Sequence, residues 1–218
     1  MEKEQILENT KEYVKNACMG ETSGHDWWHI ERVYQNAQKI NETEQADSFL
    51  VGMIAYLHDL YDHKFFSGDP RKKLEETILL LDPNEKLSKE QKENIIHSCL
   101  NLGYANNILQ KQELSIEGKI VQDADRLDAL GAIAIARTFT YSGAKGRPMY
   151  LPEEKEQGVT PEEYQKNGSK SSIGHFYDKV LKVKEKMNTD TAKKLAEERH
   201  RFVEIYLQEF LDEWYGRK

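Results

Sequence analysis

Apolar side chains recur every three or four residues along most of the chain, which is the spacing of helices that bury one face. Residues 49–57 and 120–136 show this spacing most clearly. The sequence shows neither the alternating pattern of strands nor an internal repeat. This pattern predicts an all-α protein, and the length of 218 residues favours a single-domain helical bundle over residues 1–218.

Residues that typically cap helices mark where the helices begin. Asp26, Asp69 and Ser88 each precede an apolar pattern, and either Asp47 or Ser48 can begin the central helix. The helices expected from these signals cover residues 2–18, 27–40, 48–63, 70–81, 88–100, 115–141, 173–187 and 190–214.

Residues 142–172 lack the helical periodicity. They contain glycines, prolines and scattered basic residues, among them Lys145 and Arg147. An irregular segment of this length inside a compact domain usually has a function or is mobile. We therefore predict a flexible flap over a binding site at about residues 142–172.

Reactive side chains gather where the central apolar helix ends. His58, Asp59, Asp62 and His63 follow its apolar residues in quick succession. If the helix continues through them, these side chains fall within about 140° of one face, at about 100° per residue. One buried or cleft-facing patch could then hold all four, which indicates a functional site.

Two residues that are distant in the sequence complete a possible metal site. His29 lies on the helix that Asp26 caps, and Asp125 lies on a later helix. Because a His-Asp pair alone is common by chance, these additional residues are what make a metal site credible. The predicted ligands are His29, His58, Asp59 and Asp125. Two imidazoles and two carboxylates suit a divalent ion with open water positions, for which manganese is favoured and iron, cobalt, nickel, zinc or magnesium are alternatives.

Several further segments occur in a characteristic order along the chain. They are residues 24–33, the His58-Asp59 pair, residues 123–131, residues 175–179 and residues 199–202. Taken together, they resemble the HD-domain metal-dependent phosphohydrolases of the small stand-alone bacterial type. The resemblance implies a helical bundle of the HD-domain type, a bound divalent metal ion and hydrolysis of phosphate bonds in nucleotides.

The resemblance also suggests which residues transfer protons. An acidic residue occupies the place of Asp62 in the resembling enzymes, so Asp62 is the first candidate to orient or deprotonate water. His63 is the second candidate, and it stands where certain relatives carry a second acid. Lys64 follows directly and is assigned both to catalysis and to substrate binding.

An anionic substrate requires cationic partners on the protein. Arg32, one turn after His29, and Lys64 are the nearest cations in the sequence. Asp128 is a candidate for a sugar hydroxyl or for orienting a ligand histidine, and a helix-internal salt bridge with Arg126 or a neighbour is the alternative. The predicted substrate contacts are Arg32, Lys64, Asp128, Lys145, Arg147, His175 and Lys179.

Three functions compete. We favour hydrolysis of (deoxy)nucleoside triphosphates to a monophosphate and pyrophosphate, with a nucleotide phosphatase or phosphodiesterase as the near alternative. A non-catalytic module that binds a metal or nucleotide for signalling is the second. A di-iron oxygenase is the third, and it would need more inward histidines between His63 and Asp125, where His97 alone occurs.

Composition narrows the partners and the location. A formal net charge of −7 disfavours a stable complex with nucleic acid. Cys18 and Cys99 form no thiolate motif, and the sequence shows no signal pattern and no apolar run long enough to cross a membrane. We therefore expect a cytoplasmic monomer or homodimer whose partner is a small nucleotide.

Two aromatic residues and two histidines keep open interpretations. For Trp27 and Trp28 core packing is favoured, and stacking on a nucleobase is the alternative. His25 is either a partner of a metal ligand or a turn residue. His97 fits a core position better than a metal site.

Overall fold

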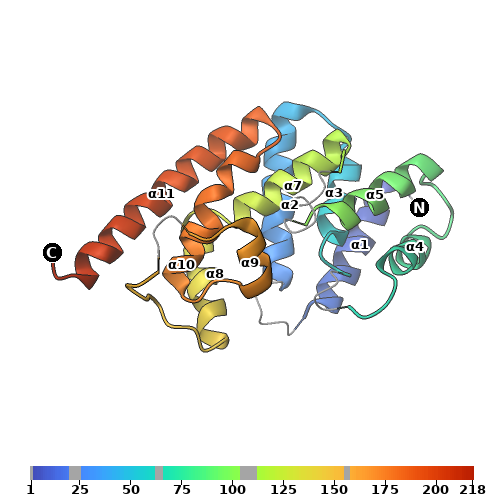
Figure 1. Cartoon of the computed structure of the whole chain (residues 1–218). Coiled ribbons are helices and arrows are strands. Elements are labelled where there is room, and N and C mark those ends of the chain that lie inside the picture. Colours follow the sequence, from blue (N-terminus) through green and yellow to red (C-terminus); the bar gives the residue numbers. More distant parts are fainter. Residues whose placement is uncertain (1, 20–25, 62–65, 104–111, 155–157) are drawn as a thin grey trace. The chain divides into compact units, whose positions relative to one another are not determined.

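The computed structural model of the chain is built from helices (Figure 1). The structure describes residues 2–19, 26–61, 66–103, 112–154 and 158–218, without the side chains of residues 161, 162 and 165. No strand occurs among these residues, so the all-α prediction is confirmed. The chain divides into two compact units, Met1–Asp125 and Arg126–Lys218, and each is described by itself. That residues 1–218 act as a single domain stays a prediction.

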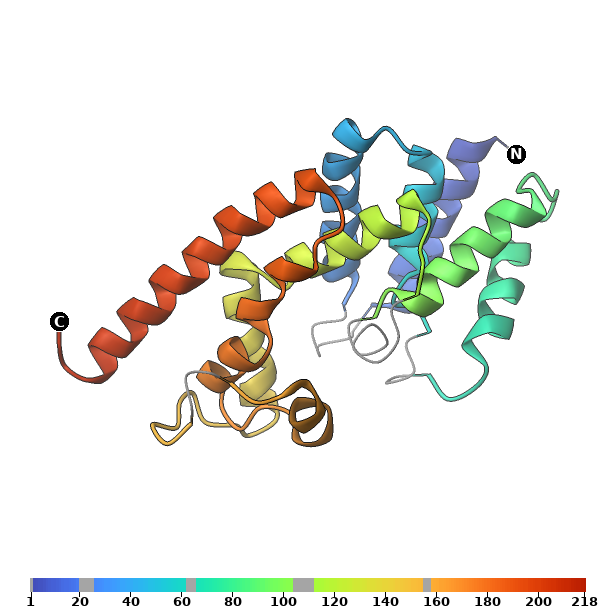
Figure 2. The same ribbon diagram turned by 45° about the horizontal axis from the view of Figure 1, so that its top comes forward.

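The first unit is built around a short buried helix. Its helices are α1 (Lys3–Ala17), α2 (Trp27–Glu44), α3 (Ser48–Leu57), α4 (Pro70–Leu81), α5 (Lys89–Asn101) and α7 (Ile116–Asp128), whose last residues belong to the second unit. Every residue of α3 from Leu50 to Leu57 is buried. Helices α1, α2 and α5 pack against α3, as Figure 2 shows. Because a helix buried on all sides is fixed by its neighbours, α3 holds the residues that follow it in place.

The predicted helix caps are confirmed. The Asp26 side chain accepts a hydrogen bond from the backbone N–H of His29, and the Asp69 side chain caps α4. Asp47, and not Ser48, caps α3. Ser88 begins α5 with reciprocal side-chain and backbone hydrogen bonds to Gln91. Each of these caps satisfies backbone donors that a helix start leaves without an internal partner.

The predicted end of the central helix is wrong. Helix α3 ends at Leu57, and His58 to Tyr61 form a turn in which the Leu60 N–H donates to the Leu57 carbonyl. His58 and Asp59 therefore are not presented by the face of a continuing helix. The apolar pattern could not reveal this end, because the residues after it have no apolar period of their own.

The second unit contains a long C-terminal helix and several short ones. Its elements are α8 (Gly131–Ala144), α9 (Pro161–Asn167), α10 (Ser172–Asp178), the 3₁₀ helices Val180–Lys182 and Lys184–Lys186, and α11 (Asp190–Trp214). Helix α11 lies along α8 (Figure 1). Between them, Phe139 from α8 and Tyr206 and Phe210 from α11 have ring centroids 6.2 Å apart. These half-buried rings join the two helices.

The single helix predicted over residues 115–141 is wrong, because the chain breaks between α7 and α8. Leu130 is extended, and Gly131 has a φ of +80°, a conformation that L-residues rarely adopt. The Ala129 and Leu130 N–H groups donate to carbonyls three residues back, which tightens the end of α7. The apolar period continues across this break, so periodicity alone could not detect it.

Residues 142–187 also differ from the prediction. The predicted helix 173–187 is α10 followed by the two 3₁₀ helices, and the predicted flap at residues 142–172 includes the helix α9. Backbone hydrogen bonds join Ser172 to Pro148 and Ile173 to Met149. These bonds fix part of the segment to the start of α10. The flexibility of the flap stays a prediction, and residues 155–157 lie outside the described residues.

Candidate metal centre

His29 comes from the first turn of α2. The Asp26 cap fixes where this helix starts, since the Asp26 carboxylate accepts the N–H of His29 at 2.9 Å. The side chain then points into the unit and is only 2% exposed. Its ring lies edge-on to that of His58, with the ring centroids 5.4 Å apart. An imidazole from α2 and one from the turn after α3 therefore lie against each other.

The backbone carbonyl of Ala55, one turn earlier in the chain, fixes the tautomer of His58. Its Nδ1 lies 2.8 Å from the carbonyl oxygen of Ala55, so Nδ1 carries the hydrogen and donates it. The other ring nitrogen, Nε2, then has a free lone pair. It is buried and has no hydrogen-bond partner. A buried acceptor without a donor is costly, and metal-binding histidines are typically fixed by such an Nδ1–H···O=C bond.

Asp125 completes a group whose ligand atoms converge. The ligand atoms of His29, His58 and Asp125 all lie within 4.8 Å of one another, and His29 Nε2 is 3.5 Å from Asp125 Oδ1. Two ligands about 2.0–2.2 Å from one ion are at most about 4.4 Å apart, so small adjustments would suffice. The Asp125 side chain is 33% exposed, so this group meets solvent there. We call these three residues the metal cluster; they form a possible metal site, and the donor set fits a divalent ion.

Asp59 lies next to the metal cluster. Its Oδ2 is 3.9 Å from His29 Nε2, and its side chain is mostly buried. The residues whose ligand atoms all lie within 4.8 Å of one another are His29, His58 and Asp125, and Asp59 is not among them. The structure thus brings Asp59 close enough to share an ion with His29, and its role as a ligand stays a prediction.

Other predicted residues of the first unit fall into two groups. Asp62, His63, Lys64 and His25 lie outside the described residues, so their roles stay predictions. Arg32 is half-buried on α2 one turn after His29.

His97 is a satisfied histidine. Its Nε2 bonds to the Glu113 carbonyl at 2.9 Å, and the Asn101 amide lies 3.4 Å from its Nδ1. His97 does not belong to the metal cluster. His97 is therefore satisfied by hydrogen bonds, as predicted, but it is half-buried and not a core residue. The second metal that an oxygenase requires gains no ligand from it.

Asp128 lies buried at the end of α7, in the second unit. Its carboxylate forms an ion pair with Arg137 at 2.5 Å. The Arg199 guanidinium, whose pKa is lowered by burial, is also near enough to interact with Asp128. Asp128 thus forms a salt bridge, but the partner in it, Arg137 on α8, is not a residue of its own helix. Contact of Asp128 with a sugar or with a ligand histidine stays a prediction.

The remaining predicted substrate residues gather in the second unit. Lys145 Nζ and the Arg147 guanidinium carbon both lie 5.8 Å from the ring centre of Tyr141. Burial, with Lys179 and Arg147, lowers the pKa of His175 to about 3. The structure therefore brings these predicted residues into one region of positive potential. We call Lys145, Arg147, Lys179 and His175 the basic cluster.

His175 is neutral at pH 7 and has hydroxyl partners. Its Nδ1 lies 3.3 Å from Ser169 Oγ and 3.4 Å from the Tyr164 hydroxyl. Sequence reasoning missed both residues. Tyr164 lies on α9, inside a segment that has no periodic signal, so only the capping pattern of Thr160 and Glu163 could have indicated that helix.

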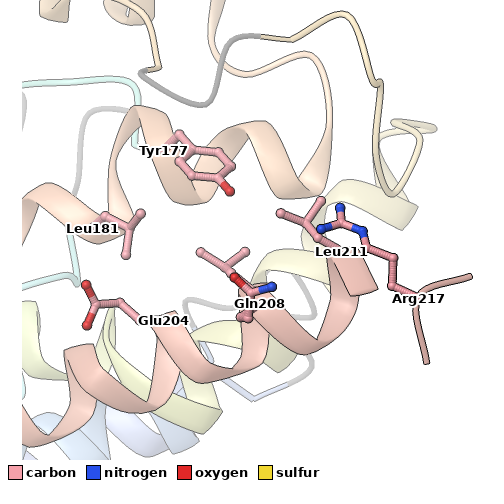
Figure 3. Close-up of a pocket in the computed structure, with 7 residues that line it drawn as sticks. Tyr177, Leu181, Glu204, Gln208, Leu211 and Arg217 are labelled. Atoms are coloured by element: carbon pink, nitrogen blue, oxygen red, sulfur yellow. The ribbon is translucent and has the colours of Figure 1, made fainter. Parts of the chain in front are cut away.

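A pocket of about 420 Å³ opens between α10 and α11 in the second unit. Figure 3 shows its walls, with Tyr177 on one side and Glu204, Gln208 and Leu211 of α11 on the other. Arg217 closes one end. The described residues that line this pocket do not include the predicted metal ligands His29, His58, Asp59 and Asp125.

Comparison with known proteins identifies the class. The HD domain family model matches residues 27–130, a range that includes the whole metal cluster. The uncharacterized protein YpgQ of Bacillus subtilis is 40% identical over 204 residues, covering 90% of this chain and 87% of YpgQ. The chain belongs to the HD-domain family.

Solved structures agree with this assignment. A crystal structure of YpgQ in complex with ADP is similar with a TM-score of 0.74 and 35% identity, covering 98% of this chain and 96% of that one. An HD-superfamily hydrolase from Bacillus thuringiensis has a TM-score of 0.74 and 39% identity, with coverage of 98% and 99%. A Lactobacillus plantarum protein has a TM-score of 0.81 and 31% identity, with coverage of 99% and 100%.

The family assignment supports a coarse description of the chain. It has the fold of the HD-superfamily hydrolases, and its metal cluster lies within the matched range. In the described part of the chain, each helix is too short or too polar to cross a membrane.

Proposed function

We propose that this protein is a metal-dependent nucleotide pyrophosphohydrolase, which converts a (deoxy)nucleoside triphosphate into a monophosphate and pyrophosphate. The observation that carries the proposal is His58, whose buried Nε2 lone pair has no hydrogen-bond partner and faces His29 and Asp125. The crystal structure of the related YpgQ with ADP supports a nucleotide as the ligand. The native ion that we propose is manganese, with Asp59 as a fourth ligand.

The metal cluster supplies the ligands, and other residues act on the substrate and water. When bound, a divalent ion neutralises charge on phosphoryl oxygens and acidifies water. His29 and His58 can bind it as neutral imidazoles, and the burial of His29 keeps its ring from turning away. The solvent-exposed side of Asp125 leaves room for a phosphate to approach.

Asp62, Lys64 and Arg32 are proposed to carry out the chemistry around this centre. Asp62 orients water and accepts its proton as the oxygen attacks the α-phosphorus. The bond from the α-phosphorus to the bridging oxygen breaks, and pyrophosphate leaves with the electron pair. Lys64 and Arg32 hold the phosphoryl oxygens and offset the charge that develops on them. His63 is the alternative proton carrier.

The basic cluster is proposed to bind the polyphosphate tail. A triphosphate carries several negative charges, and Lys145, Arg147 and Lys179 supply several positive ones. The low pKa of His175 supports this role, because it results partly from the positive potential of Lys179 and Arg147. A neutral His175 can donate a hydrogen bond but adds no charge.

The position of bond cleavage tests the proposal. The manganese-supplemented protein is incubated with individual nucleoside and deoxynucleoside triphosphates in ¹⁸O-labelled water, and the products are separated and weighed by mass spectrometry. We expect the label in the nucleoside monophosphate, with unlabelled pyrophosphate.

Other products would contradict the proposal in distinct ways. Free nucleoside with triphosphate would mean cleavage toward the sugar, and orthophosphate alone would mean a phosphatase. Tight nucleotide binding without any product would identify a binding module.

A further inference from the structure

The two adjacent tryptophans at the start of α2 have different environments. Trp27 is 5% exposed and stacks on Tyr56, with ring centroids 6.1 Å apart. Trp28 is 65% exposed. Among the described residues, Trp28 has no aromatic or cation–π contact that would explain an indole in this position. Core packing therefore accounts for Trp27, whereas Trp28 exposes most of its indole to solvent.

Trp28 is placed beside the metal cluster by the helix itself. At about 100° per residue, Trp28 and His29 are about 100° apart around α2, and Arg32 falls about 40° from Trp28, between them. Around this face of α2, the order is the buried His29, then the half-buried Arg32, then the exposed ring of Trp28. This order matches the parts of a nucleotide whose phosphate is at the metal cluster and at Arg32.

We propose that Trp28 is a specificity-determining residue that stacks on the nucleobase of the substrate, an inference that rests on the function proposed above. An aromatic ring stacks on any base because every base has a π face, so Trp28 favours nucleotides over inorganic polyphosphates and tolerates different bases. Arg32 holds a phosphate on the same face of α2. Removing water from the exposed face of the indole costs little free energy, because that face is apolar.

The test separates base recognition from phosphate recognition. Isothermal titration calorimetry with manganese compares an α,β-methylene deoxynucleoside triphosphate with inorganic tripolyphosphate, which has no base. We expect Trp28→Ala to weaken binding of the nucleotide analogue about five-fold or more, from the typical size of base–aromatic stacking. The loss for tripolyphosphate should be clearly smaller. Trp28→Phe should recover most of the nucleotide affinity.

Controls address folding and surface effects. Leu80→Ala removes another exposed apolar side chain of the first unit, 64% exposed on α4, and should not change the preference for the nucleotide. Nucleotide should also quench the fluorescence of the parent more strongly than that of Trp28→Phe. Circular dichroism confirms that each variant folds.

Two results would overturn the inference. Equal weakening of both ligands by Trp28→Ala would mean that the indole does not read the base, and no weakening of either would mean that it does not contact the substrate. In both cases a parent protein that still cleaves at the α-phosphorus keeps the proposed function. A parent that cleaves no nucleotide would refute the function itself, which the ¹⁸O experiment detects independently.

Discussion

The metal cluster and the basic cluster have opposite electrostatic surroundings. In the first, imidazole and carboxylate acceptors converge, and one of them, His58 Nε2, is buried without a donor. In the second, burial together with Lys179 and Arg147 lowers the pKa of His175 to about 3, and the Nδ1 of His175 has hydroxyl neighbours. The metal cluster can therefore accept a cation, and the basic cluster carries positive charge that can attract an anion.

This difference indicates which kind of ion each cluster attracts. Electron-pair donors without hydrogens attract a cation, whereas a group of lysines and arginines attracts an anion. A nucleotide with its metal ion has both charges. The two clusters lie in separate units, so substitutions can alter one cluster and leave the residues of the other unchanged. Predictions for both clusters follow, beginning with the largest expected effect.

Removing a ligand from the metal cluster should have the largest effect. We expect His58→Ala and Asp125→Ala to lose the ion, and turnover should fall about 10³-fold, since metal ions supply several kcal/mol to such reactions. The metal content of the purified variants is measured by elemental mass spectrometry, and turnover is measured by steady-state kinetics.

His97→Ala is the matched control for this prediction. It also removes a half-buried histidine of the first unit, but one that bonds to Glu113 and lies outside the metal cluster. Its metal content should equal that of the parent. Parental metal content in both His58→Ala and Asp125→Ala would show that the cluster does not bind the ion.

Changing the proposed proton carrier should have a smaller effect and should leave the metal in place. Asp62→Asn keeps the size of the side chain and removes its basicity, so turnover should fall about 10²-fold with normal metal content. Lys64→Ala should mainly raise KM or lower transition-state stabilisation. Kinetics on metal-saturated variants distinguish these effects, and parental turnover in Asp62→Asn would remove that residue from the mechanism.

The sequence predicted helix starts better than helix ends. Asp26, Asp69 and Ser88 are local signals, since a side chain bonds to a backbone two or three residues away. The end of α3 at Leu57 and the break at Leu130 and Gly131 after α7 have no such local signal, and the apolar period does not encode them. This is why the central helix was predicted to run on to His63.

The metal cluster was predicted better than its surroundings. His29, His58 and Asp125 were found from residue types and order, and the structure brings their ligand atoms together. The Ala55 carbonyl that selects the His58 tautomer is a backbone group, so no residue type could announce it. The burial of Trp27 beside the exposed Trp28 likewise requires the packing of α2 on α3.

Altering the basic cluster should affect substrate binding more than turnover. We expect Arg147→Ala and Lys179→Ala each to raise KM for a triphosphate about ten-fold, the usual size of one charge-assisted contact, with a smaller effect for a monophosphate. Lys193→Ala is the control, because it removes the same charge from the second unit where Lys193 pairs with the exposed Asp190. Equal KM changes in all three variants would show only a general effect of charge.

An effect on stability, and not on turnover, should appear in the pH dependence of unfolding. The pKa of His175 is about 3 in the folded protein, against about 6.5 in an unfolded chain. Between these values the unfolded chain binds more protons, so the free energy of unfolding falls as the pH is lowered from about 6.5 toward 3. For His175 alone the loss between pH 7 and pH 5 is about 2 kcal/mol.

His175→Gln isolates this contribution, because glutamine keeps a hydrogen-bonding side chain and cannot take up the proton. Urea unfolding of parent and variant at pH 7 and pH 5 gives two differences in stability. The acidic groups of the chain contribute to both proteins alike, so the parent should lose about 2 kcal/mol more than the variant. Equal losses would mean that His175 can be protonated in the folded protein at little cost, so that neither its burial nor Lys179 and Arg147 oppose the proton.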